Sequence, residues 1–195
     1  DTTIFSAKFF GNLFSNDVSK FYLYYNVYIK QISYILNILG INLNTVPVLD
    51  IFRKNSHKII GDRSYSSNPK IVSIIGDFCI NKFHKNKIGT IIKHIPGHGL
   101  SKVDSHLKLP IVKNKYKYLF NNDFRVFKNK KSLFSMTSHI IYKNIDESFP
   151  ATHSKNILKL IRDKIEFKNL IISDDISMKA LKHSISTNTR LAFNA

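Results

Sequence analysis

Apolar side chains recur at three- and four-residue intervals in several stretches of the chain, the period of an amphipathic helix. The pattern predicts helices over 18–39, 69–83, 116–127, 156–165 and 177–192. The first of these has polar residues 15–17 before it and Gly40 after it, which favour a helix start and a helix end. Pro69 stands where the second helix begins, a position that proline favours.

Short and nearly continuous apolar runs lie between these helices and are typical of buried strands. They predict strands over 41–51, 88–92, 133–141 and 170–172. Pro47 falls inside the first run, where it is tolerable near the end of a strand. Strands that alternate with amphipathic helices indicate an α/β protein with parallel βα units and outer helices. In that architecture reactive side chains gather after the carboxyl ends of strands, here after Asp50, Ile92, Met136 and Ile172.

Composition bounds the class of protein and its compartment. The chain has 195 residues, of which 43% are apolar, enough for one domain with a sizeable core. Cys79 is the single cysteine, which excludes an internal disulfide and favours a reducing compartment, the cytoplasm. No apolar run approaches the roughly 20 residues that span a bilayer, so we expect no membrane partner.

The net charge of +17 comes from 30 basic residues against 13 acidic ones. Such an excess fits either a solvated surface or a surface that binds nucleic acid or anionic lipid. The basic residues are mostly Lys and scatter along the chain, whereas Arg supplies the planar fork that favours base and phosphate contacts. We therefore expect no nucleic-acid partner, with a basic binding module kept as an alternative.

The stretch Lys93-His94-Ile95-Pro96-Gly97-His98-Gly99, followed by Asp104-Ser105-His106, carries the most chemistry. Asp104 and His106 are two positions apart, so in an extended segment their side chains point the same way. A carboxylate beside an imidazole orients the ring and raises its basicity, which suits general acid/base catalysis. Asp174 follows the last predicted strand, and Arg63 lies in a loop where it could clamp a polar ligand.

Two other interpretations of the histidine group stay open beside acid/base catalysis. His94, His98, Asp104 and His106 are all metal-ligand types, and such clusters can hold zinc. Their spacing matches no compact structural zinc pattern, so we expect no metal. Polar loop residues that only cap a barrel are the remaining interpretation.

The stretch Lys93-His94-Ile95-Pro96-Gly97-His98-Gly99, with Asp104-Ser105-His106 after it, resembles the signature of glycoside hydrolase family 3. Three more matching segments occur in the family's order: residues 47–50, 61–65 and 172–178. Within the family, the chain is most similar to the bacterial β-N-acetylglucosaminidases of cell-wall recycling. Several ordered matches over about residues 41 to 180 are far more specific than one short motif.

The resemblance implies a (β/α)₈ TIM barrel and a retaining exo-glycosidase that uses no metal and no organic cofactor. It implies that Asp174 is the nucleophile and that His106 is the acid/base residue, with Asp104 as its partner. It also implies three residues that hold the sugar: Lys93, His94 and Arg63. The implied substrate is a saccharide or muropeptide with a terminal β-linked N-acetylglucosamine.

The length does not fit a whole barrel, which takes about 200 to 250 residues and eight strands. With four predicted strands, residues 1–195 are expected to form one incomplete barrel domain of the family's N-terminal type. A complementing fragment of the same barrel would complete it. The alternative to a glycosidase is a catalytically inactive remnant or a basic binding module.

Overall fold

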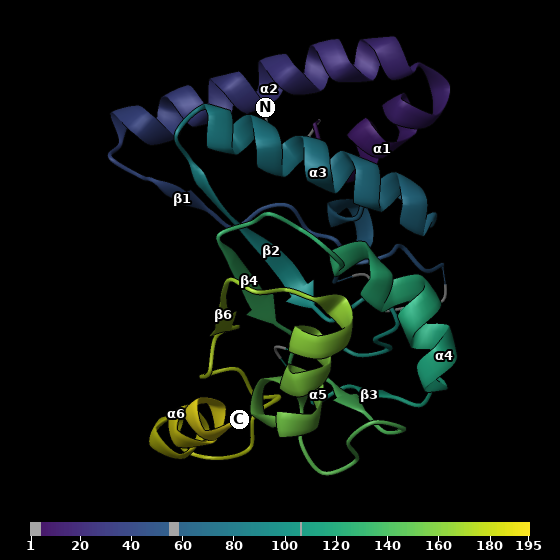
Figure 1. The fold of residues 1–195 in the computed structure, drawn as a ribbon, viewed down its shortest axis with the longest axis vertical. Coiled ribbons are helices and arrows are strands. Elements are labelled where there is room, and N and C mark those ends of the chain that lie inside the picture. Colours follow the sequence, from purple (N-terminus) through teal and green to yellow (C-terminus); the bar gives the residue numbers. More distant parts are fainter. Residues whose placement is uncertain (1–4, 55–58, 106) are drawn as a thin grey trace.

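The computed structural model describes residues 5–54, 59–105 and 107–195. A sheet of four parallel strands, in the order β1-β2-β4-β6, lies among the helices (Figure 1). Its strands are β1 (Leu43–Asn44), β2 (Gly89–Ile95), β4 (Phe134–Thr137) and β6 (Leu170–Ser173). Two short strands, β3 (Ile111–Val112) and β5 (Ile141–Tyr142), pair in parallel as a second sheet. The prediction of an α/β protein with a parallel sheet is confirmed.

The part of the chain that the structure describes holds six α-helices. They are α1 (Ala7–Asn16), α2 (Val18–Ile38), α3 (Pro69–Lys85), α4 (Tyr116–Leu119), α5 (Lys155–Leu160) and α6 (Ile185–Asn194). Further helical turns extend two of them, over Phe120–Phe124 and Arg125–Phe127 after α4 and over Ile161–Ile165 after α5. Two short 3₁₀ turns are η1 (Gly61–Arg63) and η4 (Ala151–His153). The helices predicted over 18–39, 69–83, 116–127 and 156–165 are therefore confirmed to within about two residues.

Local caps explain where α2 and α3 begin. The Asp17 carboxylate accepts a hydrogen bond from the Lys20 backbone N–H at 2.9 Å, and the Asn68 side chain does the same for Lys70 at 2.9 Å. After α2 the chain passes through Gly40, whose φ of 71° is a left-handed conformation that glycine adopts readily. The first helix, α1, was not predicted.

The strand predicted over 41–51 is much shorter than expected. Pro47 offers no N–H, and regular pairing stops at Asn44. Contact with β2 resumes next to the site, because Lys93 N–H donates to the Pro47 carbonyl and Leu49 N–H donates to the Lys93 carbonyl. The segment that ends at Asp50 therefore stays against β2 without being a continuous strand.

Two other predicted elements also differ from the structure. The strand predicted over 133–141 splits into β4 and β5. The backbone N–H of Ser138 donates to the Ile95 carbonyl, and beyond Ser138 the chain leaves the first sheet. The helix predicted over 177–192 begins only at Ile185, where the Ser184 hydroxyl accepts the Thr187 N–H. Before it, the Asp175 carboxylate accepts from Ser177 and holds a turn instead.

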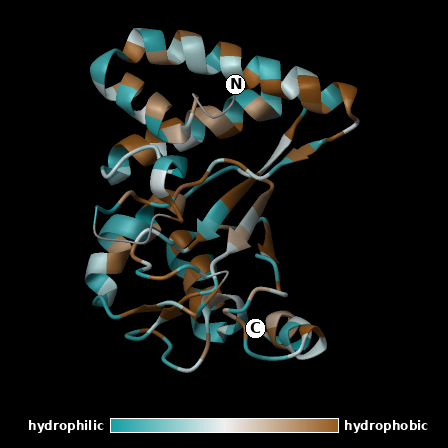
Figure 2. Ribbon diagram, turned by 180° about the vertical axis from the view of Figure 1, so that it is seen from behind, coloured by the Kyte–Doolittle hydropathy of each residue, from teal (hydrophilic) through white to brown (hydrophobic). Residues whose placement is uncertain are grey.

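One core joins the helices to the sheet. Fully buried side chains come from α2, α3, β2 and the helical stretches after α4 and α5, for example Phe21, Ile75, Ile92, Phe127 and Ile161. Figure 2 shows hydrophobic and hydrophilic residues mixed along α1 and α2, and large apolar side chains of both helices, such as Phe9, Leu23 and Val27, are exposed. No helix within the described part of the chain is long and apolar enough to cross a membrane. In that same part, β1 and β6 are the two edges of the sheet, so it is open and not a closed barrel.

Candidate active site

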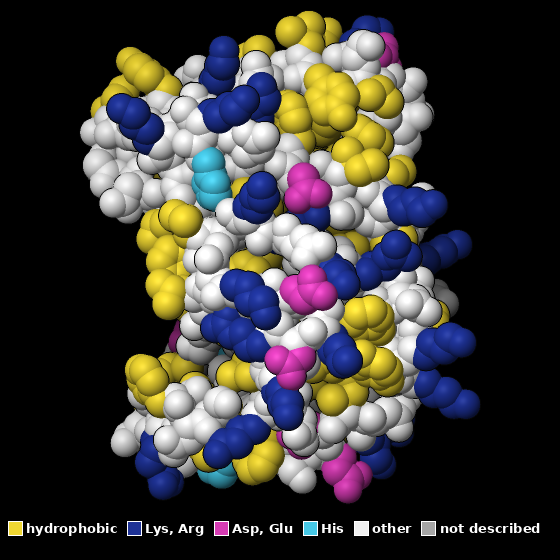
Figure 3. Space-filling view, in the orientation of Figure 1, with side chains coloured by type: hydrophobic (Ala, Val, Ile, Leu, Met, Phe, Trp, Pro, Cys, Tyr) yellow, Lys and Arg dark blue, Asp and Glu magenta, His cyan; other side chains and the backbone are white. Residues whose placement is uncertain are grey.

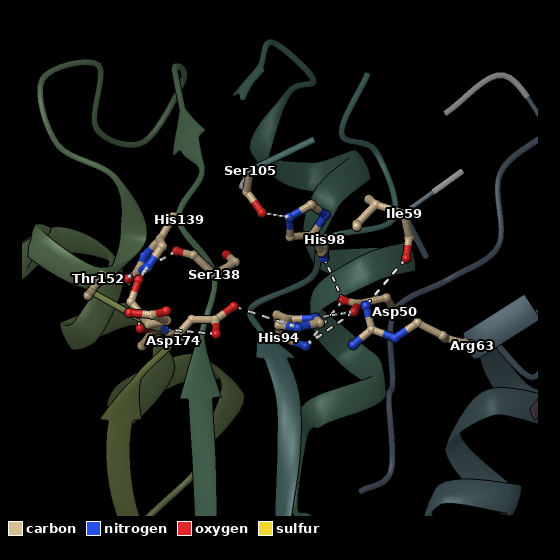
Figure 4. A network of polar contacts seen from close by, with 12 residues as sticks. Asp50, Ile59, Arg63, His94, His98, Ser105, Ser138, His139, Thr152 and Asp174 are labelled. Carbon is tan, nitrogen blue, oxygen red and sulfur yellow. Dashed lines mark hydrogen bonds and ion pairs between the residues drawn. The ribbon is translucent and has the colours of Figure 1, made fainter. Parts of the chain in front are cut away.

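The carboxyl ends of β2 and β6, and the segment before Asp50, bring a histidine and two carboxylates together (Figure 4). Nε2 of His94, in β2, lies 3.8 Å from Oδ2 of Asp174, which follows β6 directly. On the other side of the ring, Nδ1 of His94 lies 2.6 Å from Oδ2 of Asp50. The strand-end rule predicted this position for polar side chains, and His94 and Asp174 do lie together there.

Asp50 is fully buried and accepts several hydrogen bonds. Besides the His94 ring, its carboxylate receives the backbone N–H groups of His94 at 3.3 Å and of His98 at 2.6 Å. Burial alone would raise the pKa of Asp50. The His94 imidazole and the hydrogen bonds from His94 and His98 outweigh burial, so the pKa lies below its usual value. The Asp50 carboxylate is therefore ionised at neutral pH.

Lys93 and Arg63 add positive charge to the site. Burial lowers the pKa of the half-buried Lys93, and the nearby Arg63 guanidinium lowers it further. Asp174 and Asp50 act in the opposite direction on the same ammonium group. Arg63 lies in η1, where Nη1 donates to the Ile59 carbonyl at 3.3 Å. The structure thus places the charges of Arg63 and Asp174 close enough to influence the Lys93 ammonium group, with His94 beside Asp174.

The loop after β2 carries the remaining predicted residues. Buried His98 has its pKa lowered to about 4, mainly by burial and secondly by His94, and its Nε2 contacts the Ser105 hydroxyl at 3.1 Å. The Asp104 carbonyl accepts the N–H groups of the residues at 107 and 108, so Asp104 lies in a turn. His106 lies outside the described residues, and its pairing with Asp104 stays a prediction.

A second polar network supports the Asp174 turn and was not foreseen from the sequence. Asp175 N–H donates to Oδ1 of Asp174 at 2.9 Å, while Oδ2 of Asp174 faces His94. Buried His139 contacts the Asp175 carbonyl through Nε2 at 3.0 Å and the Thr152 hydroxyl through Nδ1 at 2.7 Å. The sequence signal for His139 was its place three residues after Met136, one of the positions that the strand-end rule named.

Asp123 is a further buried carboxylate, and it lies next to Gly97 in the loop after β2. Its Oδ2 accepts from Arg53 Nη2 at 3.0 Å, and a Cβ on Gly97 would lie 3.1 Å from its own Cβ. Burial raises the pKa of Asp123 to about 6, against the opposing effect of Arg53 and with a smaller contribution from Asp50.

This raised pKa predicts how stability depends on pH. Between 3.8 and about 6 the folded chain holds a proton on Asp123 that the unfolded chain has lost. The free energy of unfolding therefore falls by up to about 3 kcal/mol as pH rises through this range. Asp123→Asn keeps the shape of a neutral carboxyl, so we expect it to remove this dependence. Urea unfolding of both proteins from pH 4 to 7 measures it, and parallel pH curves would refute the assignment.

No three His, Cys, Asp or Glu side chains gather into a metal-binding group within residues 5–54, 59–105 and 107–195. The rings of His94 and His98 are edge-to-face with centroids 5.4 Å apart. Nδ1 of His94 is directed to Asp50 and not to a shared centre. Within these residues the structure therefore pairs His94 with Asp50, and the expectation of no metal, which also involves His106, stays a prediction.

Known proteins are similar to this chain in sequence and in fold. Residues 14–195 match the family model described as the glycosyl hydrolase family 3 N-terminal domain. A β-hexosaminidase of Actinobacillus pleuropneumoniae serotype 5b (strain L20) is 38% identical over 146 residues, which cover 72% of this chain and 41% of that protein. The chain thus spans about two fifths of the length of this curated relative.

Two solved structures superpose closely on the chain. The structure of NagZ from Neisseria gonorrhoeae in complex with N-trifluoroacetyl-D-glucosamine has a TM-score of 0.86 and 28% identity, covering 97% of this chain and 56% of that one. The β-N-acetylglucosaminidase from Thermotoga maritima has a TM-score of 0.74 and 34% identity, covering 87% of this chain and 37% of that one. With the match to the family model over residues 14–195, these likenesses show that the chain belongs to glycoside hydrolase family 3.

Proposed function

We propose that this chain carries the sugar-binding and nucleophile part of a retaining exo-glycosidase that releases terminal β-linked N-acetylglucosamine. The observation that carries the proposal is the distance of 3.8 Å between Asp174 Oδ2 and His94 Nε2. These two residues lie at the carboxyl ends of β6 and β2, the strands on either side of β4. A carboxylate at such a strand end, beside cationic and imidazole groups, can reach the anomeric carbon of a sugar that those groups hold.

Asp174 is the proposed nucleophile of a two-step displacement. One of its carboxylate oxygens attacks the anomeric carbon, and the glycosidic oxygen leaves with a proton from His106, which Asp104 orients. In the second step His106 takes a proton from water, and that water releases the sugar from Asp174. A histidine with an ordinary pKa near 6.5 suits both proton transfers near neutral pH. The contact between His98 and Ser105, at 3.1 Å, tethers the loop directly before His106.

Lys93, His94 and Arg63 are the proposed sugar-binding residues. The cations of Lys93 and Arg63 can donate to hydroxyl groups of one pyranose ring, and the His94 nitrogen that faces Asp174 can accept from another hydroxyl. Together they would fix the ring against the nucleophile. The relatives are named as a β-hexosaminidase and a β-N-acetylglucosaminidase, and one neighbour holds an N-acylated glucosamine analogue. These names support an N-acetylglucosamine-containing saccharide as substrate, and a muropeptide is our narrower proposal within that class. The proposed cytoplasmic location rests on Cys79, the single cysteine of the sequence, which leaves no internal disulfide.

The test is hydrolysis of an aryl N-acetyl-β-glucosaminide by the purified protein, followed by proton NMR of the released sugar. We expect the β-anomer to form first, because two displacements retain configuration. The matching aryl β-glucoside, which lacks the N-acetyl group, serves as the substrate control. A first product of α configuration would contradict the mechanism.

The alternative of a basic binding module makes a different prediction for the same sample. It predicts no glycoside hydrolysis and an affinity for nucleic acid that falls steeply with salt. Figure 3 shows Lys and Arg side chains spread over the face in view and interrupted by acidic and apolar ones. This distribution fits a solvated surface better than one compact patch for a phosphate backbone.

A further inference from the structure

We infer that Asp50 is a positioning residue that fixes which ring nitrogen of His94 carries a proton and so directs the other nitrogen toward Asp174. The inference concerns the geometry of the chain itself. Only its kinetic consequence rests on the glycosidase function proposed above.

The first step is the hydrogen-bonding capacity of Asp50. An ionised carboxylate can only accept hydrogen bonds, and burial with a lowered pKa keeps this one ionised at neutral pH. The His94 nitrogen at 2.6 Å from Oδ2 must therefore be the donor. Nδ1 of His94 carries the proton, and this leaves Nε2 as the atom 3.8 Å from Asp174.

The second step is the loop that the same carboxylate holds. Oδ1 of Asp50 accepts the His98 backbone N–H at 2.6 Å, while Oδ2 receives the His94 ring. The backbone N–H of His94 lies 3.3 Å from both oxygens. The buried Asp50 carboxylate thus positions the end of β2 and the start of the following loop. Its Oδ1 holds the loop at His98, and its Oδ2 holds the His94 ring.

An asparagine at this position cannot perform both tasks. It has one acceptor oxygen and one NH₂ donor in place of two acceptor oxygens. If its oxygen stays on the His98 N–H, its NH₂ group faces Nδ1 of His94 and forces the proton onto Nε2. If its oxygen faces Nδ1, two donors meet at His98 and the loop is displaced. Either arrangement disturbs the relation between His94 and Asp174.

The direct test uses the unaltered chain and needs no substrate. Long-range ¹H–¹⁵N NMR of ¹⁵N-histidine-labelled protein at neutral pH shows which ring nitrogens carry protons, and His94→Gln identifies the His94 signals. We expect a protonated Nδ1 at His94. An Nδ1 without a proton would overturn the inference, whether or not the protein hydrolyses a glycoside.

The second test compares Asp50→Asn with Asp146→Asn. Asp146 is a suitable control because its carboxylate also accepts several hydrogen bonds, from Ser148, Phe149 and Ser154. We expect Asp50→Asn to move the His94 proton to Nε2 or displace the His98 amide signal, and to lower kcat about 100-fold or more. The control should do none of these.

The outcomes separate the two proposals. A folded Asp50→Asn protein with wild-type His94 signals and wild-type kcat would overturn the role of Asp50. If Asp50→Asn does not fold, the spectrum of the unaltered chain decides. If the unaltered protein has a protonated Nδ1 but hydrolyses no glycoside, the proposed function fails and the positioning role stands.

Discussion

Asp174→Ala is expected to lower the rate of glycoside hydrolysis by about 10³-fold or more, without loss of the fold. The variant removes the only group that is proposed to form the bond to the anomeric carbon. We expect a small structural cost, because the Asp175 N–H that Oδ1 accepts is exposed and can bond to water once the carboxylate is removed. Steady-state kinetics and a thermal melt of both proteins measure the two parts of this expectation.

Two comparisons make the Asp174 result specific. Asp163→Ala also removes a carboxylate, but from an exposed position, and should leave turnover unchanged. Azide can enter the space left at residue 174 and attack the sugar in place of the carboxylate, so it should restore activity and yield a glycosyl azide of inverted configuration. A variant that keeps more than a tenth of wild-type turnover without azide would show that Asp174 is not the nucleophile.

The sequence predicted the long elements because their signal is local. The stripe of α2 and the cap at Asp17 lie within one continuous stretch, so periodicity alone places this helix. Strands β3 and β5 have two residues each, too few for any period. Regular pairing of β1 ends at Asn44 and returns only as a bridge between Val48 and Lys93, an interruption that the apolar run over 41–51 does not reveal.

In the candidate site, too, the sequence predicted the residues with a local signal and missed contacts that depend on the fold. His94 and Asp174 follow apolar runs, and the strand-end rule was enough to expect them in one place. The same rule pointed to the chain after Asp50, but it gave no hydrogen-bond partners, and those at His94 and His98 lie 44 and 48 positions further along the chain. The Asp123 pair with Arg53 spans 70 positions and depends on burial that only the fold produces. His98 was foreseen as a candidate ligand or acid/base group, and burial instead keeps it neutral near pH 7.

Gly99→Ala is expected to damage both stability and turnover. A Cβ on Gly99 would lie 2.2 Å from the Ile51 carbonyl oxygen and 3.1 Å from the Ile51 carbonyl carbon and nitrogen, all backbone atoms that cannot rotate away. The loop after β2 must then move off the segment that carries Asp50, which lengthens the bond from His98 N–H to that carboxylate. We expect a loss of about 1–3 kcal/mol in unfolding free energy and about 100-fold in turnover.

Gly89→Ala is the control for Gly99→Ala, because it also adds a methyl group but places it far from Ile51. Its Cβ would meet Leu43 Cδ2 at 2.5 Å and Leu133 Cδ1 at 2.9 Å, the ends of two partly exposed side chains that can rotate. Gly89 begins β2, so this variant tests the same strand at the end opposite to the site. We expect turnover close to that of the unaltered protein and a smaller loss of stability. Because both variants add one methyl group beside β2, equal losses of turnover would mean that the close approach of Gly99 to Ile51 does not position the site.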